Sequence, residues 1–333
     1  MKRKLVISKT PLRVSFFGGG TDIENYYLKK NGKVISTTID KYVYVTIKEH
    51  GELFRRNFRL NYSKSENKNT LSKIENNIIR ETLRIMKIKR PLYISSISDI
   101  PDRTGLGSSS SFTVGLIKAL YAFEGKKISK KNIAELACKI EINILRNPIG
   151  KQDQYAATYG GLNSITFKKK GVFINPLKYK KNFIKMIFNN SILVFSGNTR
   201  SASKILKDQK RNHNLNLSNL NDLKDISEKF LKLSKKDLTI NNFSKLLKNN
   251  WDIKKKLSKK INSRKIENLI KICNENGALA VKLLGAGGGG FIFVLIKKNN
   301  INLIKKKIKN FEFVSCKYEP IGSSIILEEK KWY

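Results

Sequence analysis

A loop of glycines and serines at residues 101–111 constrains the fold most, because it connects two different hydrophobic patterns. Before it, Leu92–Ile97 is typical of a strand, and after it Ser108–Phe123 carries apolar residues at helical spacing. The free N–H groups and the dipole at a helix start favour anions, and four consecutive serines add hydroxyl donors and oxygen ligands for Mg²⁺. The segment therefore predicts a phosphate-binding loop, although it lacks the GxxxxGKS/T pattern of a Walker A loop. The alternative is a helix that is simply well capped.

Two further glycine-rich segments predict close backbone approaches. In Gly18–Asp22, three glycines follow a strand, and the aspartate can accept hydrogen bonds from hydroxyl groups or cap a helix at Glu24–Lys29. Gly285–Gly290 formally satisfies GxGxxG, but Phe291–Ile296 after it is strand-like, whereas a dinucleotide-binding loop opens a helix. This loop is therefore expected to approach a ligand or another loop.

The composition is that of a globular chain with an unusual charge. Among its 333 residues, 67 are Lys or Arg and 26 are Asp or Glu, giving a formal net charge of +41. A basic surface can serve a nucleic acid or an anionic membrane. However, Lys, Asn and Ile are abundant together, and the A/T-rich codons that they share predict the same surface without a partner. Three widely spaced cysteines exclude a disulfide framework and a CxxC site, and two histidines argue against zinc and Ser-His-Asp chemistry.

No segment predicts insertion into a membrane or export. Lys9, Pro11 and Arg13 interrupt the N-terminal apolar residues, and the longest apolar runs are far shorter than the ~20 residues that span a bilayer. We therefore expect a cytoplasmic protein without a membrane partner.

Strands and helices mix along the chain without a regular βαβ repeat, which predicts an α+β fold. The character of the sequence changes after about residue 182, so we expect two domains, 1–185 and 186–333. The expected strands are Leu5–Ile7, Leu12–Phe17, Lys33–Ile39, Tyr42–Ile47, Leu92–Ile97, Ser164–Phe167, Val172–Ile174, Ser191–Phe195, Ala280–Leu284, Phe291–Ile296 and Phe313–Tyr318. The expected helices are Ile74–Met86, Ser108–Phe123, Lys130–Leu145, Ile266–Asn276 and Ile301–Phe311, with helical segments from Ser201 and across His213–Leu257.

Two acidic residues are candidates for the chemistry that a phosphate loop serves. A phosphate loop, a carboxylate loop and almost no histidine favour phosphoryl transfer, which needs positioning, a metal, cationic charge and a base. Asp153, next to Lys151 and just before the short helix expected at Tyr155–Tyr159, is the candidate base, or else a helix N-cap. Glu141 would hold Mg²⁺, or be an ordinary solvated helix position.

Three segments, Pro11–Asp22, Pro101–Ser111 and Lys282–Phe291, resemble the ordered motifs of the GHMP kinases, and the similarity covers nearly the whole chain. Within that superfamily, FFGGGTD, TGLGSSSSF, GKQDQYAATYGGLN and LLGAGGGGF most resemble D-glycero-α-D-manno-heptose 7-phosphate kinases. The resemblance implies a ribosomal protein S5 domain 2-like N-terminal domain, a ferredoxin-like C-terminal domain, and an active site between them.

The resemblance also implies roles for the matching residues. Asp153 would be the catalytic base, with Arg13 beside it to stabilise charge on the transferred phosphoryl group. The ATP-binding residues would be Pro101, Gly105, Leu106, Gly107, Ser108, Ser109 and Ser110, and Mg²⁺ would be held by Ser109 and Glu141. The substrate-binding residues would be Gly19, Gly20, Thr21, Asp22, Arg200, Gly287 and Gly288. Arg200, between a strand and a helix, suits a bidentate contact with a substrate phosphate, or is a plain surface arginine.

We therefore expect a kinase that uses ATP and Mg²⁺ to phosphorylate the anomeric C1 hydroxyl of a heptose 7-phosphate. The 1,7-bisphosphate product leads to nucleotide-activated heptose for capsule, lipopolysaccharide or S-layer glycan. A kinase for a free sugar such as galactose or fucose would leave Arg200 without a phosphate to bind. Nucleic-acid binding is disfavoured because RNP-type, KH and zinc motifs are missing, and a non-catalytic relative would not need Asp153 and Glu141. Nothing in the sequence specifies an oligomeric interface.

Overall fold

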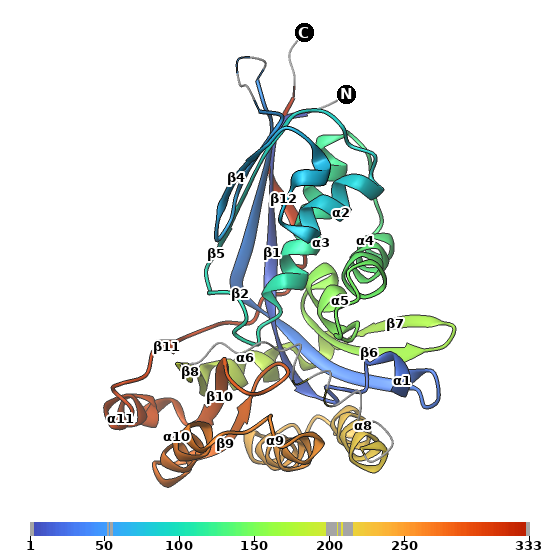
Figure 1. The fold of residues 1–333 in the computed structure, drawn as a ribbon. Coiled ribbons are helices and arrows are strands. Elements are labelled where there is room, and N and C mark those ends of the chain that lie inside the picture. Colours follow the sequence, from blue (N-terminus) through green and yellow to red (C-terminus); the bar gives the residue numbers. More distant parts are fainter. Residues whose placement is uncertain are drawn as a thin grey trace.

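The computed structural model describes residues 3–51, 53, 56–197, 205, 208 and 216–330. Within these residues the chain forms two sheets, which Figure 1 shows with the larger one above the smaller. The larger, eight-stranded sheet has the order β12 (Ser324–Lys330), β1 (Arg3–Phe17), β2 (Gly32–Glu49), β5 (Leu92–Ser98), β3 (Phe58–Asn61), β4 (Ser65–Lys68), with β6 (Leu162–Lys168) beside β2 and β7 (Gly171–Pro176) beside β6. The four-stranded sheet has the order β11 (Phe313–Val314), β8 (Ser191–Phe195), β10 (Phe291–Ile296), β9 (Ala278–Leu283). The predicted α+β fold is confirmed.

Strands β1 and β2 are each one long element, and the prediction of two short strands in each place was wrong. The register between them shifts where Pro11 pairs with Tyr42 and the next residue, Leu12, pairs with Ile39. Proline has no N–H to donate to the ladder, so a bulge at this point keeps the strands paired on both sides of it. The bulge divides β2 into a part that pairs with β5 and a part that pairs with β6.

Helices cover one face of the larger sheet (Figure 1). They are α2 (Asn77–Ile85), α3 (Ser108–Phe123), α4 (Lys130–Cys138) and α5 (Gln152–Tyr159). The central helix α3 packs tightly on β1, because a Cβ on Gly115 would lie 2.8 Å from Thr10 Oγ1. Ser8 Oγ also donates to Gly115 O over 2.9 Å. The start of α3, where the glycine and serine loop ends, is thereby anchored to the sheet.

The single helix predicted at Lys130–Leu145 is two elements. The side chain of Ser129 caps α4 by accepting from Asn132 N, as expected, but the α-helix ends at Cys138. A π-helical turn, η2 (Lys139–Ile144), follows and carries Glu141. Such turns are rare and frequently lie at functional sites.

The helical segment predicted across residues 213–257 is divided in the same way. It contains α8 (Leu217–Lys232) and α9 (Ile240–Lys254), and Thr239 caps α9 by accepting from Asn242 N. The remaining helices are α1 (Glu24–Tyr27), α6 (Lys181–Asn189), α10 (Arg264–Glu275) and α11 (Ile301–Lys307). The helix expected from Ser201 falls mostly outside the described residues, as does Arg200.

A cluster of aromatic rings joins the two sheets. Phe16 at the end of β1 contacts Phe243 of α9 and Phe293 of β10, with ring centroids 5.1 and 5.6 Å apart. Its neighbour Phe17 lies 5.2 Å from Phe230 of α8. Because these side chains are fully buried, the end of β1 sits in a core shared by both halves of the chain. The domain division at residues 185/186 stays a prediction.

The chain also returns to its first strand near the C-terminus. Strand β12 pairs antiparallel with β1 from Arg3 to Lys9, and it was not predicted, nor were β3 and β4. The expected strand at Phe313–Tyr318 is limited to two residues in β11. Edge strands tolerate charged residues, so Leu-Glu-Glu-Lys at the end of β12 gave no clear strand pattern.

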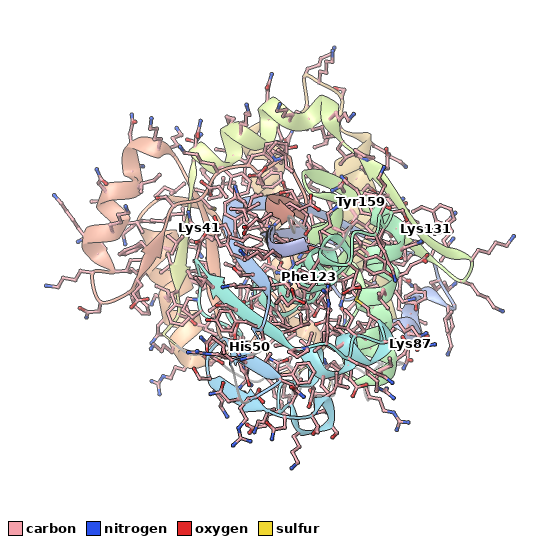
Figure 2. The ribbon with its side chains drawn as sticks, turned by 90° about the horizontal axis from the view of Figure 1, so that it is seen from above. Lys41, His50, Lys87, Phe123, Lys131 and Tyr159 are labelled. Atoms are coloured by element: carbon pink, nitrogen blue, oxygen red, sulfur yellow. The ribbon has the colours of Figure 1, made fainter. Side chains whose placement is uncertain are left out.

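The basic side chains are spread over the molecule. Figure 2 shows nitrogen-tipped side chains around the whole outline, with Lys87 and Lys131 at the periphery and Phe123 in the interior. This distribution agrees with the scattered lysines of the sequence rather than with one basic face. Among the described residues, no helix is both long and apolar enough to cross a bilayer.

Candidate active site

The three glycine-rich loops of the sequence meet around one cavity of about 920 Å³. Residues from both halves of the chain line it, among them Arg13, Asp22, Gly105, Glu141, Asp153 and Gly287. Loops that lie far apart in the sequence therefore share one site, at the junction of the two sheets.

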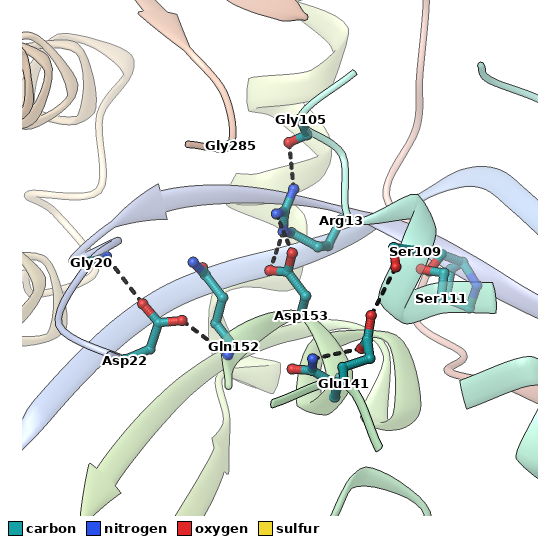
Figure 3. Close-up of polar contacts among 12 residues, drawn as sticks. Arg13, Gly20, Asp22, Gly105, Ser109, Ser111, Glu141, Gln152, Asp153 and Gly285 are labelled. Atoms are coloured by element: carbon teal, nitrogen blue, oxygen red, sulfur yellow. Dashed lines mark hydrogen bonds and ion pairs between the residues drawn. The ribbon is translucent and has the colours of Figure 1, made fainter. Parts of the chain in front are cut away.

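Arg13 and Asp153 form a bidentate ion pair in the wall of this cavity (Figure 3). Arg13 Nε donates to Asp153 Oδ1 over 2.8 Å, and Nη2 donates to Oδ2 over 2.6 Å. The arginine side chain is 5% exposed and the aspartate side chain 22% exposed, so the carboxylate is held in one orientation and still reaches the cavity. Lys151, the cation near Asp153 in the sequence, makes a different contact. Its ammonium lies over the ring of Tyr27, 4.9 Å from the ring centroid. Asp153 also lies inside α5, whose N-cap is Lys151, so it is not a cap.

The glycine and serine loop wraps around the same arginine. Gly105 and Gly107 have φ values of +84° and +81°, which favour glycine, and Gly107 is the N-cap of α3. Arg13 donates from its backbone N to Leu106 O over 3.0 Å and from Nη1 to Gly105 O over 2.5 Å. A Cβ on Gly107 would lie 3.3 Å from Arg13 Cγ. One side chain therefore fixes both the loop and the carboxylate of Asp153.

Glu141 is a fully buried carboxylate bound by neutral donors. Ser109 Oγ donates to Oε1 over 2.8 Å, and Gln154 Nε2 donates to Oε2 over 2.7 Å. Burial raises the pKa of Glu141, while the hydrogen bonds from Gln154, Ser110 and Ser109 work in the opposite direction. The solvated helix position that the sequence left open for Glu141 is thereby excluded.

Asp22 connects the first glycine loop to the start of α5. Its Oδ1 accepts from Gly20 N and its Oδ2 from Gln152 N, both over 3.1 Å (Figure 3). Burial raises the pKa of Asp22, and the nearby negative charge of Asp153 adds to this effect. Asp22 is not a helix cap, because the N-cap of α1 is Ile23. Each carboxylate oxygen keeps a second lone pair that could accept from a hydroxyl group.

The third glycine loop lies against the phosphate-type loop. A Cβ on Gly285 would lie 2.6 Å from Gly105 Cα, and a Cβ on Gly290 would lie 2.3 Å from Thr104 O. Phe291 N donates to Thr104 O over 2.9 Å. The glycines are therefore needed for contact between two loops, which was one of the two alternatives that the sequence left open.

Some predicted substrate and nucleotide residues do not line the cavity. Thr21 is fully buried and its hydroxyl donates to Gly18 O over 2.8 Å, so it closes the turn. Leu106 is fully buried, and Gly288 N donates to Ile261 O over 2.7 Å. The other predicted positions within the described residues line the cavity, namely Arg13, Gly19, Gly20, Asp22, Pro101, Gly105, Gly107, Ser108, Ser109, Ser110, Glu141, Asp153 and Gly287.

Several residues of the cavity wall were not predicted from the sequence, among them Ser15, Gln152 and Lys254. Ser15, two positions after Arg13 on β1, has a buried hydroxyl without a hydrogen-bond partner among the described residues, and the same holds for Gln152 Oε1. Lys254, the last residue of α9, is 7% exposed and borders the cavity. A signal for it exists, since Lys254 falls at helical spacing from the buried Leu247 and Trp251.

Two family models of known proteins together match most of the segments that line this cavity. The family model for the GHMP kinases N terminal domain matches residues 70–161, which include the phosphate-type loop, Glu141 and Asp153. The model for the GHMP kinases C terminal region matches residues 231–313, which include Lys254 and the third glycine loop.

The chain is also similar to individual kinases over nearly its full length. It is 32% identical to the D-glycero-alpha-D-manno-heptose 7-phosphate kinase of Campylobacter jejuni subsp. jejuni, over 93% of this chain and 97% of that protein. It is 27% identical to the mevalonate kinase of Methanocaldococcus jannaschii, over 91% and 96%. Among solved structures, a D-glycero-D-manno-heptose 1-phosphate kinase from Bacteroides thetaiotaomicron has a TM-score of 0.79 at 24% identity, covering 98% of this chain and 99% of that one.

Proposed function

The chain belongs to the GHMP kinases, and from this premise we propose that it transfers the γ-phosphoryl group of ATP to the anomeric C1 hydroxyl of D-glycero-α-D-manno-heptose 7-phosphate. The product would be the 1,7-bisphosphate. The observation that carries the reaction type is the Arg13–Asp153 pair, which lies against the helix-opening glycine loop in the wall of one cavity. The choice of sugar rests on the relative that is 32% identical over 93% of the chain.

The phosphates of ATP would bind at the start of α3. Backbone N–H groups at a helix N-terminus and the αL glycines Gly105 and Gly107 make an anion site. The hydroxyl of Ser109 reaches the cavity, whereas Ser111 is fully buried and its hydroxyl donates to Pro11 O. Ser108, Ser109 and Ser110 would therefore contact the phosphates, whereas Ser111 anchors the helix to β1.

Asp153 would accept the proton of the C1 hydroxyl as the oxygen attacks phosphorus. An anomeric hydroxyl is more acidic than an ordinary sugar alcohol, so a carboxylate is a sufficient base. Arg13 would hold this carboxylate in place and bring positive charge close to the phosphoryl group in transit. Both roles use the geometry of one bidentate pair.

Ser109 and Glu141 fit a magnesium ion. A hydroxyl oxygen and a carboxylate oxygen lie 2.8 Å apart, and hard oxygen donors are what Mg²⁺ prefers. When bound, Mg²⁺ would supply positive charge to the phosphate oxygens. Two protein oxygens suffice, because Mg²⁺ keeps water and substrate phosphates as its other ligands. Gln154 would orient Glu141 by its hydrogen bond to Oε2.

The sugar would lie beside the first glycine loop. Gly19, Gly20 and Asp22 border the cavity there, together with the unpartnered Ser15 hydroxyl and Gln152 carbonyl. Polar atoms of this kind suit the several hydroxyl groups of a sugar. The contact of Arg200 with the 7-phosphate remains a prediction from the sequence.

The test is consumption of ATP with Mg²⁺ over a panel of acceptors: D-glycero-D-manno-heptose 7-phosphate, sedoheptulose 7-phosphate, mannose, galactose, fucose and mevalonate. We expect turnover on the manno-heptose phosphate, with the new phosphate on C1. Turnover on a free sugar or on mevalonate alone would keep the kinase and discard the heptose. Turnover on none of them, with ATP still bound, would point to a non-catalytic relative.

If the heptose is the substrate, the reaction would supply a bisphosphate for nucleotide-activated heptose. The next reaction must remove the 7-phosphate or transfer a nucleotide to the 1-phosphate, because these are the two reactive ends of the product. The nucleotide-activated heptose would in turn serve capsule, lipopolysaccharide or S-layer glycan synthesis.

A further inference from the structure

Lys254 brings a cation to the cavity from the C-terminal half of the chain, whereas Arg13 and Arg103 line the cavity from the N-terminal half. It is the last residue of α9 and is 7% exposed. Its Nζ donates to Gly285 O in the third glycine loop, the one acceptor that the described residues offer it in hydrogen-bond contact. An ammonium has three donors, so two remain for a ligand in the cavity that Lys254 borders.

The position of Lys254 mirrors that of Arg13. Gly285 packs against Gly105, where a Cβ would lie 2.6 Å from Gly105 Cα. Arg13 Nη1 donates to Gly105 O, and Lys254 donates to Gly285 O. Figure 3 shows Gly285 beside Gly105, with Arg13 and Asp153 below them. The two cations thus hold the two loops from opposite halves of the chain, next to the carboxylate assigned as the base.

Four charged groups face Lys254 from the elements around it. Arg13 on β1 and Lys282 on β9 repel its charge, while Asp22 after β1 and Asp153 on α5 attract it. Burial is the largest influence and lowers the pKa of Lys254 to about 8. Lys282 differs from it, because its Nζ donates to Ser15 O and Phe16 O and it does not border the cavity.

Given the proposed function, on which this step rests, we propose that Lys254 contacts the phosphoryl group during transfer, opposite Arg13, and stabilises its charge in the transition state. In that step the C1 oxygen forms a bond to the γ-phosphorus while the bond from this phosphorus to the β–γ bridging oxygen breaks. The C1 hydroxyl proton goes to Asp153, and ADP leaves with the bridging electron pair. Lys254 gives up no proton; it contributes charge and hydrogen bonds.

Variants at position 254 separate charge from structural support. Lys254→Met removes the charge and the bond to Gly285, Lys254→Gln keeps a donor without charge, and Lys254→Arg keeps the charge. Lys256→Met, two residues along and exposed, is the control. We expect kcat to fall about 100-fold in the Met and Gln variants, by analogy with the loss of one donor to a developing charge, and less than 10-fold in Lys254→Arg. The Kd for ATP should change less than about 3-fold in all of them.

The pH profile gives a second readout. Because the charged lysine is the active form, kcat/KM of the wild type, which reports groups of the free enzyme, should fall as the pH rises through about 8, the pKa of Lys254. That decline should be missing in Lys254→Gln and should move to higher pH in Lys254→Arg, whose guanidinium stays charged. A purely structural role would leave the alkaline part of the profile unchanged.

Other results would overturn the proposal. An unchanged kcat in Lys254→Met would do so, as would weakened ATP binding with an unchanged kcat, since that marks a support for the loop. A KM that rises only for phosphorylated sugars would assign Lys254 to the substrate's own phosphate.

These assays use whichever acceptor of the panel the wild type phosphorylates, so a failure of the heptose assignment is seen separately. If no acceptor reacts, binding of ADP with aluminium fluoride and Mg²⁺ replaces turnover. Lys254→Gln should then weaken this mimic of the transferred phosphoryl group at least 10-fold and leave ATP binding unchanged. Equal weakening of both would refute the proposal.

Discussion

Two carboxylates in the same cavity, those of Asp153 and Glu141, have no hydrogen-bond donor in common. Asp153 accepts two parallel hydrogen bonds from the guanidinium of Arg13, and its side chain is 22% exposed. Glu141 meets a hydroxyl and an amide, is fully buried, and has a raised pKa because no cation among the described residues compensates its burial. One carboxylate has its charge balanced by the protein, while the other lacks a balancing cation.

This difference supports the proposed roles of Asp153 as a base and of Glu141 as a metal ligand in one cavity. A carboxylate held by two hydrogen bonds from an arginine keeps one orientation with nothing bound, as a proton acceptor requires. A carboxylate without a cation becomes more favourable when a cation binds, as a metal ligand requires. The sequence shows that both residues are acidic, but the proposed assignment of one as base and the other as metal ligand rests on the position of Arg13 beside Asp153 alone.

The largest effect is expected from Asp153→Asn. This change keeps the shape of the side chain and removes the base, so kcat should fall about 10²–10⁴-fold, the contribution typical of a general base. The Kd for ATP should stay within about 3-fold, because the phosphate-binding groups at the start of α3 are untouched. Steady-state kinetics and equilibrium binding of ATP measure the two quantities.

Asp222→Asn, an exposed change on α8, serves as its control and should leave kcat unchanged. A variant Asp153→Asn with full activity would show that another group takes the proton.

A different kind of loss is expected from Glu141→Gln. The amide keeps a hydrogen bond to Gln154 but lacks the charge that favours a divalent cation, so the Mg²⁺ concentration for half-maximal activity should rise about 10–100-fold. Activity should recover in part at saturating Mg²⁺. Glu135→Gln, on the exposed side of α4, should leave the Mg²⁺ dependence as it is. If Glu141→Gln lowers kcat without changing that dependence, the metal assignment is wrong.

The sequence predicts the loops of this site better than it predicts their surroundings. The helix Ser108–Phe123 and the strands Ser191–Phe195 and Phe291–Ile296 were predicted to the residue, because glycines and serines punctuate short hydrophobic runs there. The pairing of β12 with β1 was not predicted, because it joins residues more than 300 positions apart. Lys254 was missed for a related reason: one of 67 lysines and arginines becomes distinctive only when the fold buries it.

A smaller effect on the Mg²⁺ dependence is expected from Ser109, one of the two hydrogen-bond donors to Glu141 described above. Ser109→Ala removes the donor to Glu141 Oε1 and one oxygen from the proposed metal site. We expect about a 10-fold rise in the Mg²⁺ concentration for half-maximal activity, less than for Glu141→Gln because the charge remains. Ser72→Ala, at an exposed position, is the control. A larger effect of Ser109→Ala than of Glu141→Gln would reverse the order of importance within the pair.

The smallest effect is a change in stability with pH, and it needs neither substrate nor metal. Since burial raises the pKa of Glu141 above its ordinary value of 4.5, the folded state binds a proton more tightly than the unfolded state. Its contribution to the free energy of unfolding is therefore highest at low pH and is lost as the pH rises from 4.5 through the folded pKa.

Glu141→Gln has no such titration. Its free energy of unfolding relative to the wild type should therefore increase with pH across that window, by up to ~1.4 kcal/mol per pH unit. Urea unfolding in EDTA at several pH values between 4.5 and 7.5 measures this difference in the free energy of unfolding. For the control Glu135→Gln, the difference from the wild type should not change with pH. A difference that decreases with pH would mean that a cation of the protein compensates Glu141, and would remove the contrast with Asp153 on which the metal assignment depends.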